Sequence, residues 1–555
     1  MIIEQSTIEP KTVAETLAQA FYDNNVTHIY GVPGGGSSLP LIEAAAQLGI
    51  KFVLTRTECG AMIMASATAE LTGSIGVALT TKGPGVASAA NGAACALLDR
   101  APVVLVTDGF TEQQSGFITH QFIDQKALLK PVTKGYSKLE DNQVMSEINR
   151  LISLAMTAPC GPVHIELTGA TAKKEVVESQ TQEATPDYYS AIDNIDSFSN
   201  AHDLIIKASR PVIVVGLEAR SSENTEVTRQ LIDRSGYPVL TTYKAKGVIS
   251  DYHPQYAGIF TGGTAEAACV SQADLIILIG VDPVEFVLQK WRYQVPIIDI
   301  SVLEYPVHYM KPDVGLYGPI SINLSALLDN ISVWSSDWKL PAIKTLRRDM
   351  HDALQCQSDQ GIGPQDVVQV ALESAMATQA LHQQTRLPLI TVDAGAHMFS
   401  VMAFWPCSQP FDVLISNGLA TMAYALPAAI AAAVKIPDRM VVAFTGDGGL
   451  LMCLGELSTA VEQAVPIIII VFNDQSLSLI DIKQQASGLP SRGMRWETPN
   501  FSQVMEGLGG QGYQVNNLKQ YRQALDEALE AGKPALIDVL FNPEGYGPQL
   551  KALRG

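Results

Sequence analysis

Apolar and polar positions alternate along the first part of the chain in blocks that predict helices and strands in rotation. Val13, Leu17, Ala20 and Phe21 recur at helical spacing, and an apolar run then leads into the glycine loop of THIYGVPGGG. Strand, glycine turn and helix in rotation predict a parallel sheet with helices on both faces. The spacing predicts strands over 51–54, 76–80 and 102–106, and helices over 58–70 and 86–98.

The same rhythm returns twice. A middle block carries the apolar runs PVIVVGLEA, PVLTT and ADLIILIGVD, and a third block begins near residue 364 with LPLITVDAG. This third block continues with a helix of small residues, GLATMAYALPAAIAAAV, a second helix over 455–463 and a last strand, PALIDVLF. Polar stretches at 175–190 and 332–344 separate the blocks. The pattern predicts three doubly wound α/β domains over 1–180, 195–335 and 360–545, followed by a tail over 546–555.

Composition excludes several classes of partner. The net charge is −19 and the pI about 4.9, which argues against binding of nucleic acid or an anionic membrane. Cys59 and Cys95, the closest two of seven cysteines, are 36 positions apart (95 − 59), so no zinc or disulfide spacing exists. The first residues lack the features of a signal peptide, and VPIIIIVF is too short to span a bilayer. We expect a soluble protein of the reducing cytoplasm.

Two carboxylates follow neighbouring strands of the third block. Asp447 comes directly after MVVAFTG, and Asp474 follows the next strand 27 positions later (474 − 447). One strand–helix–strand unit brings both to the same sheet edge. With an oxygen of Ser476 they would form half of an octahedral site suited to Mg²⁺. The neighbouring glycines would let a phosphate approach the backbone: Gly446, Gly448 and Gly449. The alternative interpretation is an Asp-Gly turn that merely ends a strand.

The motif GDGG followed by ND resembles the diphosphate and metal signature of thiamine-diphosphate enzymes. Three other stretches resemble further segments of that family: VLTRTECGAMIMASATAELTG, TKGPGVASAANGAACALLDRAPVVLVTD and ISNGLATMAYALPAAIAAA. The order of the blocks matches the pyrimidine, central and pyrophosphate domains of these enzymes. The resemblance covers essentially the whole chain. It is closest to the acetolactate-synthase-like branch of a superfamily that includes acetohydroxyacid synthases, pyruvate oxidases and 2-oxo-acid decarboxylases.

The resemblance implies roles for particular residues. Glu58 would bond the pyrimidine ring nitrogen and pass a proton to it, although an acid at this helix start could also serve only the helix dipole. Met422 would be the wedge that bends the cofactor, or an ordinary core residue. The carbonyl of Ala420 would accept a bond from the pyrimidine amino group. Other residues implied to face the cofactor are Gly34, Gly35 and Pro84.

The chain departs from the family pattern where substrate would be handled. Asp474 stands in place of the second asparagine of the metal motif, Thr57 in place of a histidine before the glutamate, and Lys82 in place of a serine. In THQFIDQ, Gln121 matches the family glutamine, and His120 is an acid–base candidate or a surface histidine. These changes put acetolactate formation itself in doubt.

Two less specific features complete the candidate site. His397, in DAGAH, follows another strand of the third block and is a lower-ranked pocket residue. The tail GYGPQLKALRG would close over the site, as in relatives, or remain a solvated end.

We therefore expect a thiamine-diphosphate- and Mg²⁺-dependent C–C lyase or carboligase that acts on a 2-oxo acid or an acyloin through ylide and enamine intermediates. The family arrangement implies a homo-oligomer, a dimer or a tetramer, with Glu58 and the GDG domain of one site on different subunits. A plain 2-oxo-acid decarboxylase and a non-catalytic regulatory homologue remain alternatives. FAD is a further alternative for the middle block, although VVGLEARSSE lacks the dinucleotide fingerprint.

Overall fold

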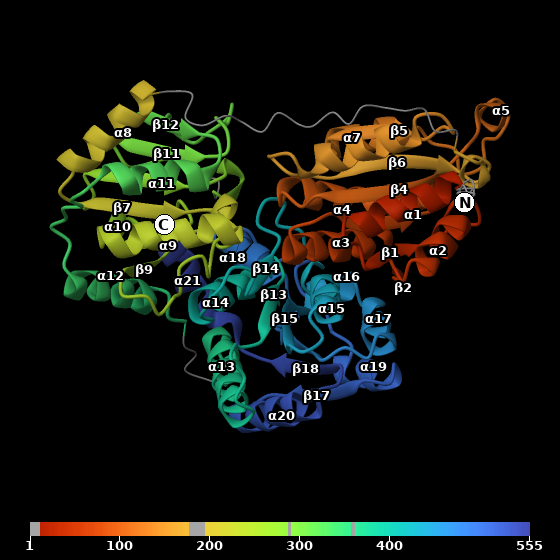
Figure 1. Cartoon of the computed structure of the whole chain (residues 1–555). Helices are drawn as coiled ribbons and strands as arrows, with labels where there is room; N and C mark the ends of the chain where they lie inside the picture. The colour runs from red at the N-terminus through yellow and green to blue at the C-terminus, as the bar shows by residue number, and fades with distance from the viewer. Residues whose placement is uncertain (1–10, 177–194, 287–289, 357–360, 555) are drawn as a thin grey trace. The chain divides into compact units, whose positions relative to one another are not determined.

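Three six-stranded parallel sheets form the framework of the chain (Figure 1). The computed structural model describes residues 11–176, 195–286, 290–356 and 361–554. The N-terminal ten residues and most of the linker predicted over 175–190 lie outside these ranges. The chain divides into two compact units, one of Met1–Pro186 with Ile430–Lys435 and one of Asp187–Ala429 with Ile436–Gly555. The predicted fold class, α/β with three doubly wound parallel sheets, is confirmed.

The sheet of the first unit has the strand order β2-β1-β3-β4-β6-β5. Its central strands are buried throughout, as expected for strands covered by helices on both faces. The strands are β1 (His28–Val32), β2 (Lys51–Leu54), β3 (Gly76–Thr80), β4 (Val103–Gly109), β5 (Gly135–Lys138) and β6 (Val163–Thr168). The helices are α1 (Val13–Asp23), α2 (Ser38–Gln47), α3 (Glu58–Thr72), α4 (Pro84–Leu98), α5 (Glu112–Ser115), α6 (Gln125–Leu129) and α7 (Val144–Met156), with short 3-10 turns η1 (Lys130–Val132) and η2 (Thr171–Lys173).

The central sheet belongs to the second unit and has the order β12-β11-β10-β7-β8-β9. Its strands are β7 (Pro211–Val215), β8 (Val239–Thr241), β9 (Tyr256–Ile259), β10 (Leu275–Ile279), β11 (Ile297–Ser301) and β12 (Val314–Tyr317). Its helices are α8 (Ile195–Lys207), η3 (Leu217–Arg220), α9 (Ser222–Ser235), α10 (Ala267–Val270), η4 (Pro283–Glu285) and α11 (Ile320–Asn330), followed by α12 (Leu340–Ala353).

The C-terminal sheet, also in the second unit, has the order β14-β13-β15-β16-β18-β17. Its strands are β13 (Leu389–Val392), β14 (Val413–Ile415), β15 (Val441–Gly446), β16 (Ile467–Asn473), β17 (Gln511–Val515) and β18 (Ala535–Leu540). Its helices are α13 (Pro364–Leu381), α14 (Ala396–Phe404), α15 (Ala425–Lys435), α16 (Asp447–Met452), α17 (Glu456–Glu462), α18 (Ser478–Ala486), α19 (Phe501–Gly507), α20 (Leu518–Ala531), η5 (Pro543–Gly545) and α21 (Tyr546–Arg554).

One local prediction for the C-terminal sheet was wrong. The helix of small residues does not begin at GLATM but at Ala425, because Ala420 and Ala423 have positive φ angles of 53° and 66° that no α-helix accommodates. The segment around Met422 is therefore a loop. The alternative interpretation of Asp447, an Asp-Gly turn that merely ends a strand, does not hold, because Asp447 is the first residue of the short helix α16.

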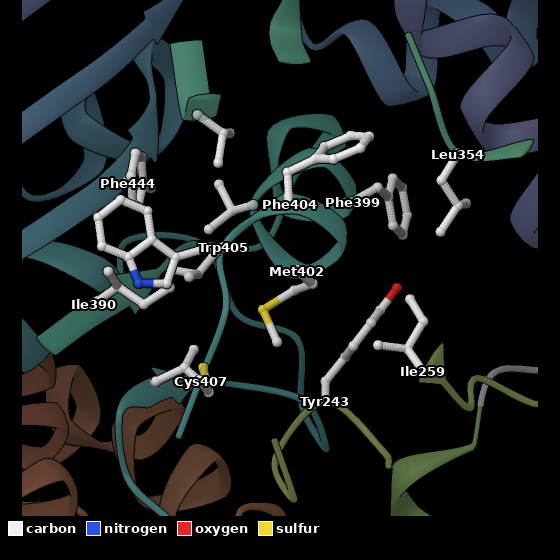
Figure 2. Packing of buried hydrophobic residues seen from close by; sticks show 14 of the residues in the cluster. Tyr243, Ile259, Leu354, Ile390, Phe399, Met402, Phe404, Trp405, Cys407 and Phe444 are labelled. Atoms are coloured by element: carbon white, nitrogen blue, oxygen red, sulfur yellow. The ribbon is translucent and has the colours of Figure 1, made fainter. Parts of the chain in front are cut away.

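A hydrophobic core runs through the second unit from the central sheet to the C-terminal sheet. Figure 2 shows Met402 of α14 between Trp405, which lies beside Phe444 and Ile390, and Tyr243 from the central part. Trp405 is 1% exposed and meets Phe444 of β15 edge-on, with ring centroids 5.6 Å apart. Burial of such aromatic side chains is the main source of stability here.

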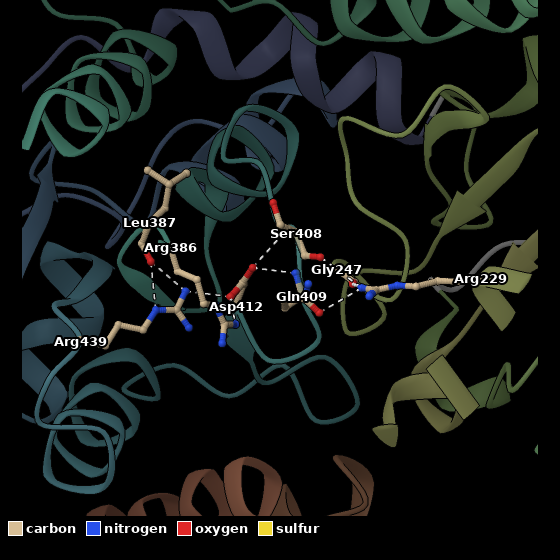
Figure 3. Close-up of polar contacts among 8 residues, drawn as sticks. All are labelled: Arg229, Gly247, Arg386, Leu387, Ser408, Gln409, Asp412 and Arg439. Carbon is tan, nitrogen blue, oxygen red and sulfur yellow. Dashed lines mark hydrogen bonds and ion pairs between the residues drawn. The ribbon is translucent and has the colours of Figure 1, made fainter. Parts of the chain in front are cut away.

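Polar contacts add specificity to the same region (Figure 3). Asp412 accepts bonds from Arg439 at 2.7 Å and from Arg386, and also from the backbone N–H groups of Ser408 and Gln409. Arg229 of α9 donates to the carbonyl of Ser408 at 3.2 Å. The loop after α14 is therefore fixed from both the central and the C-terminal part of the unit.

Candidate functional site

The carboxyl ends of β15 and β16 carry the two predicted carboxylates. These strands pair in parallel with Gly446 opposite Phe472, so the residues that follow them emerge at one sheet edge. Asp447 opens α16, and Asp474 follows β16 directly. Both line a cavity of about 260 Å³. The cavity lies at the carboxyl ends of β13 and β15, where the strand order reverses, the usual ligand position in doubly wound sheets.

The two carboxyl groups are close enough to repel each other. Burial raises the pKa of Asp447 to about 7, the neighbouring charge of Asp474 adds to this, and the Gly448 N–H bond to Oδ1 at 2.9 Å opposes it. Burial raises the pKa of Asp474 to about 6, against a hydrogen bond from the Ser478 hydroxyl. A buried pair of acids with raised pKa values is stabilised by a bound cation.

Oxygen atoms in this corner are available to such a cation. The Oδ2 atom of Asp447 and the Oγ atom of Ser476 are buried and make no hydrogen bond within the described part of the chain. Hard oxygen donors of this kind suit Mg²⁺, which usually keeps positions for water and phosphate. Among the described residues no group of three or more His, Cys, Asp or Glu forms a complete cage, in keeping with an ion shared with a ligand. The residues present fit a magnesium ion held by few protein atoms.

The glycines next to Asp447 serve two different purposes. A Cβ atom on Gly449 would lie 2.2 Å from Oδ2 of Asp393, so this glycine is required by packing within the chain. A Cβ atom on Gly448 would lie 3.3 Å from Leu477 and Trp496 and 3.4 Å from Met422. Because Gly448 and Met422 both line the cavity, larger side chains at 448 would take up cofactor space.

Asp393, after β13, is a site-building residue that the sequence analysis missed. Its carboxylate accepts bonds from the N–H groups of Ala423 at 3.1 Å and Tyr424 at 2.9 Å, and from the Thr445 hydroxyl at 2.9 Å. It thereby holds the loop of Ala420 and Met422 against the start of α16. Burial raises the pKa of Asp393 to about 6. The signal was present, because LITVD has the same strand-then-acid pattern that identified Asp447.

His397 and the C-terminal helix form another wall. Burial lowers the pKa of His397 to about 3, so the ring is neutral, and it stacks on Phe472 with centroids 5.2 Å apart. The predicted tail is the helix α21, docked within the unit by the Thr264 hydroxyl, which donates to the Ala552 carbonyl at 2.6 Å. Arg554 lines the cavity with its guanidinium 5.3 Å from the centre of the Phe399 ring.

In the first unit, Glu58 is the first residue of α3 and is half-buried. Thr57 caps this helix, since its hydroxyl accepts a bond from the Gly60 N–H at 3.0 Å. Oε1 of Glu58 faces the start of α4, where a Cβ atom on Gly85 would lie 3.2 Å away. Pro84 is exposed at the first turn of α4. Glu58 is therefore presented by a rigid helix end beside the TKGPG loop.

The glycine loop after β1 is held by Asp108, a second residue that the sequence analysis missed. Asp108 ends β4 and accepts bonds from the Ser37 hydroxyl at 2.6 Å and the Ser38 N–H at 3.1 Å. A Cβ atom on Gly34 would lie 2.2 Å from Oδ2 of Asp108, whereas Gly35 faces open space. Packing against Asp108 explains why residue 34 is a glycine. The open space at Gly35 leaves room for a ligand to approach the backbone there.

The substrate-side candidates lie on an exposed loop. His120 and Gln121 are both exposed, and Gln121 has a φ angle of 59°. The backbone carbonyl of Gln121 approaches Gly83, where a Cβ atom would be only 2.4 Å away. Lys82 lies with its ammonium group 5.0 Å from the centre of the Phe110 ring. Two of the departures from the family pattern, Lys82 and His120, thus lie on neighbouring loops of the first unit.

At the reversal point of the central sheet, between β7 and β10, the strand ends carry a buried carboxyl group as well. It belongs to Glu285 and accepts bonds from the Leu217 N–H at 2.9 Å and the Thr242 hydroxyl at 2.6 Å. A Cβ atom on Gly216 would lie 2.4 Å from Cα of Val281.

Comparison with known protein families agrees with this geometry. Three profiles match in order: "Thiamine pyrophosphate enzyme, N-terminal TPP binding domain" over 11–128, the central domain of the same enzymes over 198–327, and their C-terminal TPP binding domain over 393–539. The chain belongs to the thiamine pyrophosphate enzyme family, and it is a thiamine-diphosphate-dependent enzyme.

Among individual proteins it is acetolactate-synthase-like. The acetolactate synthase of Bacillus subtilis is 27% identical over 547 residues, which cover 97% of this chain and 94% of the relative. A probable acetolactate synthase large subunit of Methanocaldococcus jannaschii is 28% identical over 548 residues (96% and 92%). The 2-hydroxyacyl-CoA lyase of Oryza sativa is 27% identical over 554 residues (93% of each). No helix in the described ranges is long and apolar enough to cross a membrane.

Proposed function

We propose that this enzyme is a Mg²⁺-dependent C–C lyase or carboligase that acts on a 2-oxo acid or an acyloin. The observation that carries the proposal is the pair of carboxyl groups of Asp447 and Asp474 at one cavity, where Oδ2 of Asp447 and Oγ of Ser476 have no hydrogen-bond partner among the described residues. Similarity to both an acetolactate synthase and a 2-hydroxyacyl-CoA lyase supports chemistry that forms or breaks a carbon–carbon bond.

Each residue of the C-terminal sheet has a distinct task in this proposal. Asp447, Asp474 and Ser476 hold the magnesium ion, which neutralises the diphosphate and offsets the repulsion between the two acids. Gly446 and Gly448 give the phosphates access to the backbone, and Gly449 keeps the turn against Asp393. Met422 supports the cofactor from below, and the carbonyl of Ala420 orients its aminopyrimidine.

Thiamine diphosphate, when bound, supplies the carbon centre that stabilises negative charge next to the reacting carbonyl. Glu58 holds a proton on the pyrimidine ring nitrogen, and its position at the start of α3 fixes that carboxyl group. His120 and Gln121 bind the substrate carbonyl side. Arg554 is the anchor for the substrate carboxylate, because it is the cationic side chain among the residues that line the cavity.

We further propose a homodimer or homotetramer in which Glu58 of one copy completes the pocket of a second copy. This rests on the subunit arrangement of the family that the chain resembles. Sedimentation of the purified protein, with and without the cofactor, would test it.

A simple 2-oxo-acid decarboxylase is the second candidate, favoured by His120 beside Gln121, which resembles the histidine-bearing loop of those enzymes. The product distinguishes the two reactions. A carboligase releases a longer hydroxy-ketone or hydroxy-acid, and a decarboxylase releases an aldehyde.

The test is a calorimetric titration of the apo protein with thiamine diphosphate, with and without Mg²⁺, followed by mass spectrometry of products from 2-oxo acids and acyloins. We expect magnesium-dependent binding. Glu58→Gln should keep the bound cofactor but lose on the order of 100-fold or more in turnover. Full activity of Glu58→Gln would refute the proton role, and cofactor binding that ignores Mg²⁺ would refute the metal site.

A further inference from the structure

A second cavity of about 420 Å³ lies in the second unit, away from the candidate site. It opens between β9, the edge strand of the central sheet, and two helices, α12 and α14. Its lining shares no residue with the cavity of Asp447 and Asp474. None of the roles proposed above uses it.

Basic side chains from one face of α12 line this cavity. They are Lys344, Arg347, Arg348 and His351, spaced three, four and seven positions from the first. Residues at this spacing share one side of a helix. The acids of the same helix, Asp349 and Asp352, are not among the lining residues. Arg348 nevertheless pairs with Asp349 at 3.3 Å, so Lys344 and Arg347 are the main source of positive charge in the lining, in a chain whose net charge is −19.

The one acid of the lining is already neutralised. Asp251 accepts a bond from the buried ammonium group of Lys246 at 2.6 Å. Arg347 is fixed at the rim, because its guanidinium donates to the backbone carbonyl of Asp251 at 3.1 Å. Lys344 and Arg348 remain exposed. Among the described residues, the lining thus carries more positive than negative charge, and Arg347 is the cationic side chain that is held in place.

The floor of the cavity is apolar and aromatic. Ile259, Leu354 and Phe404 are buried beneath the basic face, and Figure 2 shows these side chains converging near α14. The ring of His351 meets Phe404 edge-on at 5.1 Å, and Tyr252 stands at the rim with 61% of its surface exposed. A merely solvated basic helix face would not enclose such a floor.

We propose that this cavity binds a small phosphorylated molecule with an aromatic ring, the class of nucleoside di- and triphosphates. Guanidinium and ammonium groups match phosphate oxygens, with arginine able to bind two at once. The aromatic and apolar floor accepts the base and excludes water around it. The overall negative charge of the chain would disfavour such a ligand elsewhere on the surface.

The test uses the full chain saturated with thiamine diphosphate and Mg²⁺, so that the first cavity is filled. ADP, inorganic pyrophosphate and adenosine are titrated by calorimetry at low and high KCl. We expect ADP to bind more tightly than pyrophosphate, adenosine not to bind, and added KCl to weaken ADP binding. Equal affinity for ADP and pyrophosphate would refute recognition of the ring.

The double variant Lys344→Gln with Arg348→Gln removes two exposed charges and leaves the Arg347 contact intact. ADP affinity should fall at least tenfold, while Lys339→Gln, an exposed lysine next to the first residue of the same helix but outside the cavity, should leave it unchanged. Unchanged affinity in the double variant would refute the site. The same two variants can also be compared in apo protein. A failure of this proposal can therefore be distinguished from a failure of the proposed function.

A labelling experiment keeps the proposal open to refutation even if the double variant is unstable. An amine-reactive reagent is applied to the unmodified protein with and without ADP, and the labelled lysines are identified by mass spectrometry. ADP should protect Lys344 and leave Lys339 reactive. Equal labelling of Lys344 in both samples would overturn the assignment.

Discussion

The central and C-terminal sheets of the second unit share an architecture but treat their strand ends in opposite ways. Each has six parallel strands and one point where the strand order reverses. In the C-terminal sheet that point opens into a cavity where oxygen atoms of Asp447 and Ser476 make no hydrogen bond to any described residue. In the central sheet the buried carboxyl group of Glu285 lies at that point and accepts bonds from Leu217 and Thr242.

The comparison shows that topology gives the location of a site and local side chains decide whether it is used. Both reversal points carry a buried acid. In the C-terminal sheet one oxygen of Asp447 has no partner among the described residues, which leaves it available to an ion. In the central sheet both carboxyl oxygens of Glu285 accept hydrogen bonds from the chain itself. Fold alone would have predicted two cofactor sites here.

The largest effect should come from removing the carboxyl group of Asp447 from the cavity of the C-terminal sheet. Asp447→Ala takes away a metal ligand, so magnesium-dependent binding of thiamine diphosphate should be lost and activity should fall by at least about 100-fold. Calorimetry and steady-state kinetics measure both. Asp438→Ala, an exposed acid just before β15, is the matched control and should behave as the unmodified protein. Normal cofactor affinity in Asp447→Ala would contradict the metal site.

Adding a side chain at Gly448, in the cavity of the C-terminal sheet, should have the next largest effect. Gly448→Val would place its side chain against Leu477 and Trp496, which stand 3.3 Å from a Cβ atom there, and would occupy cofactor space. Affinity for thiamine diphosphate should fall roughly 10- to 100-fold. Gly507→Ala, where a Cβ atom meets nothing within 4 Å, is the control. Undiminished affinity in Gly448→Val would show that the cofactor lies elsewhere.

Changing the charge of the cavity wall should alter substrate binding alone. In Arg554→Gln the KM for a 2-oxo acid should rise about 10-fold, because a hydrogen bond to a charged group is lost. The kcat and the affinity for thiamine diphosphate should change little. Lys551→Gln, an exposed cation on the same helix that does not line the cavity, serves for comparison in the same kinetic assay. An unchanged KM in Arg554→Gln would exclude the carboxylate anchor.

Glu285, at the reversal point of the central sheet, should affect the stability of the protein and the dependence of that stability on pH. Burial raises the pKa of Glu285 to about 8, so the native state keeps a proton that the unfolded chain, with its ordinary pKa near ~4.3, releases. Stability is therefore fully present at low pH and is lost as the pH rises towards 8. Glu285→Gln cannot ionise and should lose less stability between pH 5.5 and 8.5, by about 1–2 kcal/mol. Denaturant unfolding at both pH values measures this, and parallel losses would contradict it.

The repeated features of the chain were predictable from its sequence. Alternation of apolar runs with glycine turns was enough for the three parallel sheets. The 27-position spacing (474 − 447) correctly anticipated that Asp447 and Asp474 would be neighbours, because consecutive parallel strands end at one edge. This inference needed only local periodicity.

Features that depend on long-range partners were not predictable. Asp108 and Ser37 are 71 positions apart, and nothing local in LVTDG indicates their hydrogen bond. Ala420 and Ala423 are good helix formers, yet Asp393 holds their segment as a loop through the backbone N–H groups of Ala423 and Tyr424. The basic face of α12 was overlooked because a charged helix stripe usually faces solvent, and only the tertiary structure shows what lies beneath it.

The helix α14 has a consequence for how the molecule can respond to small molecules. Its nine residues form a rod about 13 Å long. His397 at its start lines the candidate site, and Phe404 at its end lines the basic cavity. A shift of α14 would change the lining of both cavities. If two ligands favour different positions of this helix, binding of one therefore lowers the affinity for the other. Thermodynamic reciprocity then requires that each change the other's affinity by the same factor.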